Sequence, residues 1–271
     1  MTKMMRDVII ERIIDEMSRN KRIFFLAADF GAPSLDRLRE NFKDRFINVG
    51  IAEQNLINVA TGLGLEGFTV FAYAIAPFLT MRAFEQIRVN LSLHAQVREL
   101  NVNLVGVGAG LSYEVSGPTH HSLEDMALMR LLPNFSVLSP CDTISALDCV
   151  EYAFRNKGPK YIRLDGKPLE AVYSGRLMPD MDKGFREIRK GSKVCLIATG
   201  YTTHTALTVA DRRHFSLTRP VFSVRWGSWR SSGRISRMNT GTSSRNGTLI
   251  SAILRSSPAR HFTGKGNMRP T

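Results

Sequence analysis

Two short stretches of the sequence hold side chains that could do acid–base chemistry. The stretch FINVGIAEQNLINVATGLG places one acid, Glu53, between a short apolar strand and an apolar, glycine-containing helix, and GPTHH ends in His120 and His121. Burial makes a carboxyl group a usable proton donor or acceptor near neutral pH, and imidazole titrates there without help. Without further context, Glu53 is better explained as an acid at a helix start. His121 is interpreted as a surface residue.

The cysteine count and the apolar runs indicate the compartment. The chain has three cysteines, Cys141, Cys149 and Cys195, without metal-ligand spacing, and their odd number argues against a disulfide framework. The N-terminal stretch MTKMMRDVIIERIIDEM carries acids among its apolar positions, unlike a secretory signal. No apolar run approaches the ~18 residues of a membrane span. We expect a reduced, cytoplasmic protein.

The strongly basic balance of the chain is confined to one end. The net charge is +13, but residues 211–271 hold 12 Lys and Arg against 1 acid, while residues 1–210 hold 25 against 23. The body of the protein is therefore nearly neutral. A role in nucleic-acid binding would depend on the tail alone.

Strand and helix patterns alternate along the body. Compact apolar runs predict strands, and apolar residues at helical spacing predict helices. The expected strands are 22–29, 44–50, 68–74, 101–110, 134–140 and 160–165, and the expected helices are 4–19, 56–63, 81–95, 122–132, opened by a Ser122 cap, and 143–156. This alternation predicts an α/β fold with a parallel sheet covered by helices on both faces. Ligands of such sheets gather at the carboxyl ends of the strands.

The chain divides into four parts by composition. Residues 1–170 form the α/β body, 171–190 a polar linker, 191–210 the first strand and helix of another α/β unit, and 211–271 an Arg/Ser-rich tail. Three interpretations of the tail stay open. It is a disordered basic segment, a basic arm for an acidic partner, or a stretch that has left its original reading frame; resequencing the gene tests the last.

Three ordered motifs carry a family resemblance. FINVGIAEQNLINVATGLGLEGF, APFLTMRAFEQIR and GPTHHSLEDMALMRLLPNFSVLSPCD together resemble the pyrimidine-binding domain of transketolases. The resemblance is closest to the separately encoded C-terminal subunit of split transketolases and covers about residues 1–170. KVCLIATGYTTHTALTVAD resembles the start of the family's third domain, so that domain is expected to be truncated or altered here.

The resemblance implies thiamine diphosphate as cofactor, with Mg²⁺. The family's diphosphate-binding motif, Gly-Asp-Gly followed at a distance by Asn, does not occur in the sequence. The magnesium ligands are therefore expected on a partner, an N-terminal subunit with the diphosphate-binding domain, in a homodimeric or heterotetrameric assembly. No metal ligands are assigned to this chain.

The resemblance also implies site residues. The family's Glu at position 53 hydrogen-bonds N1′ of the aminopyrimidine, so that the 4′-nitrogen can take the proton from the thiazolium C2; an apolar pocket would keep this carboxyl protonated. Phe78 and Phe84 lie where the family stacks aromatics on the pyrimidine, although both could be core residues. His120 matches a histidine near the donor substrate's oxygens. Asp29 matches a family acid, and a capping or turn role explains it equally well.

Departures from the family pattern concern the substrate. Alignment puts Gly108 and Ser116 where full-length transketolases carry a histidine and an acid. The sugar-phosphate-binding arginine falls on Asp165, with Arg163 and Lys167 near enough to supply the cation instead. A pentose phosphate substrate is therefore not fixed by the sequence.

The expected function is transfer of a two-carbon ketol unit from a ketose to an aldehyde, as one subunit of a split transketolase. Three alternatives remain: a 2-oxo acid dehydrogenase β-subunit, a deoxyxylulose-phosphate-synthase-like enzyme, and a non-catalytic partner subunit. The GPTHHSLEDMALMR segment favours the transketolase side.

Overall fold

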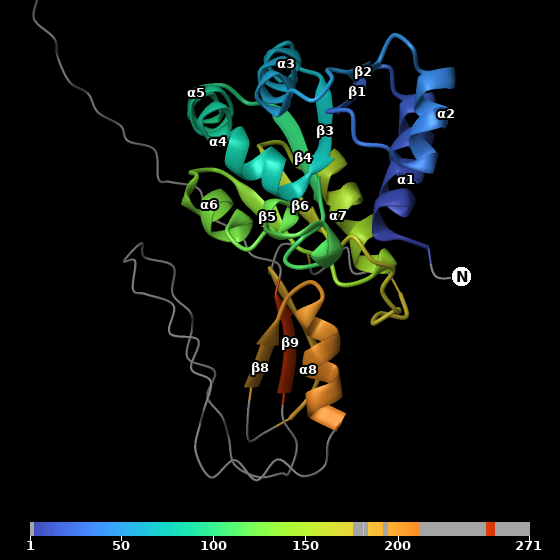
Figure 1. Cartoon of the computed structure of the whole chain (residues 1–271), viewed down its shortest axis with the longest axis vertical. Helices are drawn as coiled ribbons and strands as arrows, with labels where there is room; N and C mark the ends of the chain where they lie inside the picture. The colour runs from blue at the N-terminus through green and yellow to red at the C-terminus, as the bar shows by residue number, and fades with distance from the viewer. Residues whose placement is uncertain (1–2, 176–180, 182–183, 192–194, 212–247, 253–271) are drawn as a thin grey trace, which may run out of the picture.

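Two β-sheets organise the chain in the computed structural model (Figure 1). The structure describes residues 3–175, 181, 184–191, 195–211 and 248–252. The larger sheet has six parallel strands in the order β2-β1-β3-β4-β6-β5. Its strands are β1 Ile23–Ala27, β2 Phe46–Asn48, β3 Thr69–Ile75, β4 Asn101–Val107, β5 Ser136–Leu138 and β6 Lys160–Leu164. The predicted α/β class with a parallel sheet is confirmed.

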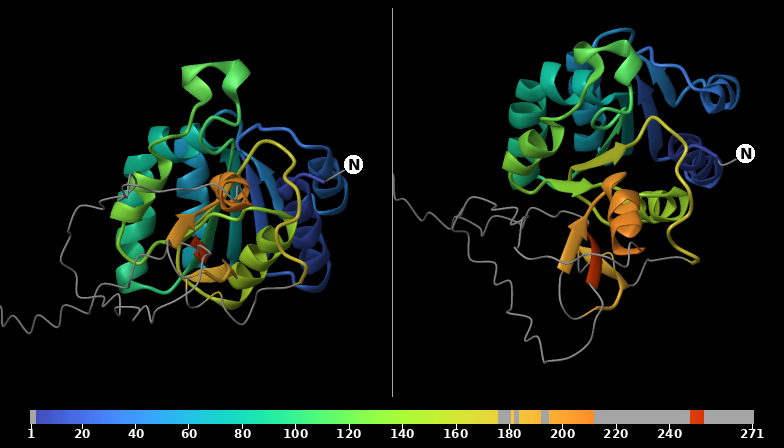
Figure 2. Two further views of the ribbon diagram at one scale, coloured as in Figure 1. Left: turned by 90° about the horizontal axis from the view of Figure 1, so that it is seen from below. Right: turned by 60° about the horizontal axis from the view of Figure 1, so that its bottom comes forward.

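Helices cover both faces of this sheet (Figures 1 and 2). One face packs against α1 (Met5–Arg19), α2 (Pro33–Asn41) and α7 (Thr143–Arg155). The other packs against α3 (Glu53–Leu65), α6 (Asp125–Leu131) and the long helix after β3. Every residue of β4 is buried, as expected for a central strand between two helical layers.

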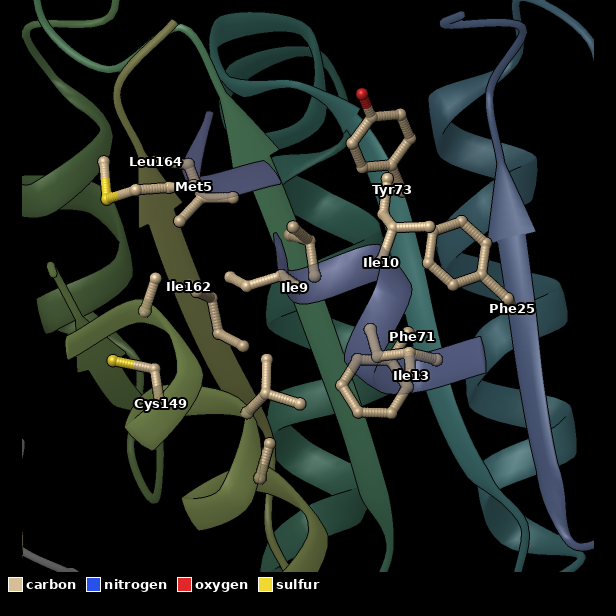
Figure 3. Packing of buried hydrophobic residues seen from close by; sticks show 14 of the residues in the cluster. Met5, Ile9, Ile10, Ile13, Phe25, Phe71, Tyr73, Cys149, Ile162 and Leu164 are labelled. Atoms are coloured by element: carbon tan, nitrogen blue, oxygen red, sulfur yellow. The ribbon is translucent and has the colours of Figure 1, made fainter. Parts of the chain in front are cut away.

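The period of the apolar residues explains this layering. Ile9 and Ile13, one helical turn apart in α1, pack with Phe71 and Tyr73, which alternate along β3 (Figure 3). The intervening residues of β3, such as Ala72, belong to the core on the opposite face. Strand periodicity of two and helix periodicity of 3.6 therefore create two cores from one sheet.

The helix after β3 begins earlier than the sequence predicts. It consists of the π-helical η1 (Phe78–Arg82), α4 (Phe84–Gln86), the π-helical η2 (Ile87–Leu93) and α5 (His94–Val97). The buried Thr80 Oγ1 donates to the Ala76 carbonyl at 2.8 Å, a local bond that perturbs regular helix geometry. Phe78 and Arg82 consequently lie in the first turn of this helix, at the carboxyl end of β3.

The predicted serine cap of α6 is wrong. The helix begins at Asp125 with Glu124 at the N-cap position and no side-chain cap. Ser122 instead exchanges two backbone hydrogen bonds with Gly110, at 3.0 and 2.8 Å. Its backbone is thus committed to an antiparallel bridge, three residues before the helix.

A smaller three-stranded sheet follows, with α8 (Thr202–Asp211) beside it (Figure 1). Its order is β7-β9-β8, formed by β7 (Phe185–Arg189), β8 (Cys195–Ala198) and β9 (Thr248–Ala252). The central strand β9 thus comes from the segment predicted as a basic tail; residues 212–247 and 253–271 of that tail lie outside the described residues. Among the helices that are described, none is long and apolar enough to cross a membrane.

Candidate active site

Glu53 begins α3, just after the short strand β2. Its carboxyl is only 3% exposed, although the residue stands in the first turn of the helix. Gly50, with φ of +75°, lets the chain turn between β2 and α3. The acid is therefore held at the carboxyl edge of the sheet, where ligands of parallel sheets bind.

Arg82 is the polar partner of Glu53. Its Nη1 donates to Glu53 Oε2 at 2.9 Å, and its side chain remains 48% exposed. The guanidinium carbon also lies 4.8 Å from the centre of the Phe78 ring, one helical turn earlier in η1. Arg82 is not among the site residues predicted from the sequence. The i, i+4 spacing of Phe78 and Arg82 is the signal that could have placed both on one face.

Phe78 and His120 meet across the site. Their ring centres are 5.1 Å apart with an interplanar angle of 68°, an edge-to-face arrangement. His120 ends the short 3₁₀ segment η4 (Pro118–His120), and its Nδ1 lies 3.0 Å from Thr119 Oγ1. Glu53, Arg82, Phe78 and His120 thus form one continuous series of contacts at the ends of three strands.

Asp29 and Phe84 make other contacts in the structure, and their cofactor-binding roles stay predictions. Asp29 adopts a positive φ of 48° and exchanges hydrogen bonds with Asn48, at 3.0 and 3.1 Å. It therefore makes a turn that joins the ends of β1 and β2. It does not cap the following helix, because the N-cap of α2 is Ala32. Phe84 packs, partly buried, against the core on the α3 face.

The cations considered for a substrate phosphate are bound to acids. Arg163 Nε lies 2.7 Å from Asp125, and Lys167 Nζ lies 2.7 Å from the exposed Glu114. Asp165 accepts the Lys167 backbone N–H, and burial raises the pKa of its carboxyl.

Gly108 cannot carry the histidine that the family pattern would place there. It has φ of +95°, and a Cβ at this position would lie 2.3 Å from the Tyr113 ring. The loop after β4 must therefore have a different conformation from the loop of a protein that carries a histidine at this position.

A buried carboxyl, an aromatic ring and an imidazole thus lie together at the carboxyl ends of parallel strands, in an α/β protein whose main sheet stands between two helical layers. Among the described residues, no group of three or more His, Cys, Asp and Glu could hold a metal ion.

Comparison with known proteins identifies the family. Residues 1–170 match the family model of the transketolase pyrimidine-binding domain, and the chain belongs to this family. Membership implies thiamine diphosphate as the cofactor.

Two curated relatives are similar over most of the chain. One of the subunits of the apulose-4-phosphate transketolase of Actinobacillus succinogenes is 33% identical over 207 residues, 75% of this chain and 64% of the relative. A putative transketolase C-terminal section of Methanocaldococcus jannaschii is 32% identical over 211 residues, 77% of this chain and 66% of the relative. The chain thus spans just under two thirds of the length of these relatives.

Solved structures agree on the fold. A split-gene transketolase described as an inactive β4 tetramer is 33% identical, with a TM-score of 0.66 over 78% of this chain and 67% of that one. A transketolase from Pichia stipitis has a TM-score of 0.72 over 93% of this chain and 35% of that one. At 15% identity, the second comparison shows the fold alone.

Proposed function

We propose that this chain is the C-terminal subunit of a split transketolase and contributes to the transfer of a two-carbon ketol unit from a ketose to an aldehyde. The observation that carries the proposal is the buried Glu53, joined through Arg82 to the rings of Phe78 and His120. The relatives named as parts of transketolases support it.

The side chains present fit an aminopyrimidine ring. The Glu53 carboxyl, 3% exposed, would hold a ring nitrogen and control its proton. The half-buried Phe78 would lie against the ring, and His120 would donate to substrate oxygens. When bound, thiamine diphosphate supplies the carbon nucleophile that breaks and forms the carbon–carbon bonds.

Arg82 adds a requirement to this arrangement. An opposite charge favours the ionised form of a carboxyl, whereas a hydrogen bond donated to a ring nitrogen needs the protonated form. Because Arg82 is half exposed, it can turn away without crossing the core. We propose that it leaves Glu53 when the site is assembled.

The proposed partner is an N-terminal transketolase subunit that carries the diphosphate-binding domain and the Mg²⁺ ligands. The absence of the Gly-Asp-Gly motif from the sequence supports this division, as does the relative described as an inactive β4 tetramer. We retain the four-part division at residues 170, 190 and 210, and a cytoplasmic location, as parts of this proposal, with β7 of the predicted linker and β9 of the predicted tail both joining β8 in the smaller sheet.

Calorimetric titration with thiamine diphosphate and Mg²⁺ tests the proposal. We expect binding for this chain mixed with a diphosphate-domain subunit encoded beside it, and none for either subunit alone. The mixture should then transfer ketol units between sugars. A stable complex that binds no cofactor would contradict the catalytic proposal and favour a non-catalytic subunit.

A further inference from the structure

The loop that carries His120 packs against the core through Tyr113 but exposes its other apolar side chains. It joins β4 to α6 through residues 111–121, and its apolar Val115 is 96% exposed. The stem is closed by the two backbone hydrogen bonds between Gly110 and Ser122, at 3.0 and 2.8 Å. Tyr113 belongs to the other end of the loop, whereas His120 stands two residues before Ser122, so its position over Phe78 depends on how firmly this side of the stem is held.

Behind the stem lies a buried carboxylate. Asp125 is fully buried, and its Oδ2 accepts from Tyr161 Oη at 2.8 Å and from Arg163 Nε at 2.7 Å. Its Oδ1 accepts the Met126 N–H at 2.8 Å. Burial, reinforced by Asp125, raises the pKa of the Tyr161 hydroxyl, which therefore stays protonated and donates. Tyr161 and Arg163 both belong to β6, so their hydrogen bonds to Asp125 fasten the end of the loop to the sheet.

Arg163 extends this network to the stem itself. Its Nη2 lies 3.5 Å from the Ser122 carbonyl, and a Cβ built on Gly110 would lie 3.7 Å from the same atom. On the other side, a Cβ built on Gly200 would lie 3.7 Å from Nη1. The side chain is only 14% exposed. The guanidinium is thus enclosed by protein atoms and directed at the stem.

We propose that the Asp125–Arg163 pair positions the His120 loop by holding its stem, and that Arg163 is not a ligand of a substrate phosphate. The effect on the loop follows from the contacts alone, while the effect on catalysis rests on the function proposed above. A buried ion pair is costly to break because the remaining charge is left uncompensated. Loss of either partner should therefore loosen the stem.

The first test measures hydrogen exchange in the isolated full chain, where no catalysis is needed. In Arg163→Gln and Asp125→Asn, we expect amide exchange over residues 110–122 to accelerate about tenfold or more, with α3 unchanged. Arg12→Gln is the matched control, since it breaks a 2.6 Å pair with Glu151 between α1 and α7. Unchanged exchange at the loop in both variants would overturn the proposal.

The second test compares substrates in the assembly with the partner subunit. If Arg163 positions the loop, kcat of Arg163→Gln should fall about tenfold to a hundredfold. The fall should be equal for a ketose phosphate and for the same ketose without phosphate. For a phosphate ligand, KM would rise for the phosphorylated donor alone and loop exchange would stay unchanged, which overturns the inference. A wild-type assembly without activity would reject the proposed function. The exchange test would still show whether Arg163 and Asp125 hold the stem of the loop.

A conservative variant covers the case in which Arg163→Gln fails to fold. Arg163→Lys keeps the charge beside Asp125 but lacks the Nη2 that reaches Ser122. Faster exchange over residues 110–122 in this variant supports the stem contact. Exchange at the wild-type rate contradicts it.

Discussion

Glu53 acquires its chemical environment from a residue that is distant in sequence. Its neighbours along the chain predict an acid with little polar company, yet Arg82, 29 positions later, donates to it. The same arginine lies over Phe78, which contacts His120. At the scale of single residues, the candidate site is therefore one cluster with a cation in its middle.

Replacing Glu53 by Gln keeps the shape of the side chain and removes its ability to exchange a proton. We expect kcat of the assembled enzyme to fall by about 10²–10⁴, with cofactor affinity changed much less. Steady-state kinetics and calorimetry on the same preparations measure both. Glu85→Gln is the control, because Glu85 is an exposed acid paired with Arg88. Activity near the wild-type level would contradict a proton-handling role.

Lys160 makes stability depend on pH. Its Nζ is buried and donates to Asn101 Oδ1 at 2.9 Å and to the Gly158 carbonyl at 2.8 Å. Burial lowers its pKa to about 7, against about 10.4 in an unfolded chain. Between these values the unfolded chain binds a proton that the folded chain does not. The contribution of Lys160 to the free energy of unfolding therefore rises with pH, by up to ~1.4 kcal/mol per unit, and is lost as pH falls toward 7.

Urea unfolding at several pH values between about 7 and 10 checks this slope. Lys160→Met serves as the reference, since it fills the same space without a titrating group. As pH rises, the unfolding free energy of the wild type should increase relative to that of Lys160→Met. A constant difference would mean that Lys160 keeps its proton in the folded protein.

Among the elements, the start of α7 joins two parts of the chain. The fully buried Asp142 accepts from Ser145 N at 2.8 Å and Oγ at 2.6 Å, and from Val172 N and Tyr173 N at 2.9 Å each. It thus caps the helix and also fixes the segment predicted as the linker's first residues. The sequence predicts the helix, but it does not predict that the cap also binds the backbone of Val172 and Tyr173.

Asp142→Ala should destabilise the protein by about 3 kcal/mol, because it removes a cap and leaves several buried donors without an acceptor. Equilibrium denaturation in urea measures the change. Asp36→Ala, which removes an exposed acid paired with Arg39, should cost less than about 0.5 kcal/mol. Equal losses in the two variants would show that the buried contacts of Asp142 contribute little.

In the whole molecule, the smaller sheet depends on a strand that is distant in sequence. β9 pairs antiparallel with β7 and parallel with β8 and lies between them. This sheet meets the larger unit where His204 Nε2 lies 2.7 Å from the Cys141 carbonyl and Thr199 Oγ1 lies 3.4 Å from the Ser139 carbonyl.

Ending the chain after Asp211 removes β9, so hydrogen exchange in β7 and β8 should accelerate while β3 and β4 stay protected. A chain ending after residue 252 keeps β9 and is the control. Exchange in β7 and β8 that is equal in the two truncated chains would contradict the pairing. In that case, the interpretations of the tail as disordered or out of frame would gain support.

The sequence by itself determined the layered fold and the family, because apolar periodicity and short motifs are local properties of the chain. The six parallel strands and the helices on both faces followed from those patterns, while Glu53, Phe78 and His120 were singled out by the family motifs. Only the tertiary structure decided which charges meet: Arg82 with Glu53, and Arg163 with Asp125. Such pairs join elements that the fold brings together, and no periodicity along the chain encodes a contact between side chains so far apart in sequence.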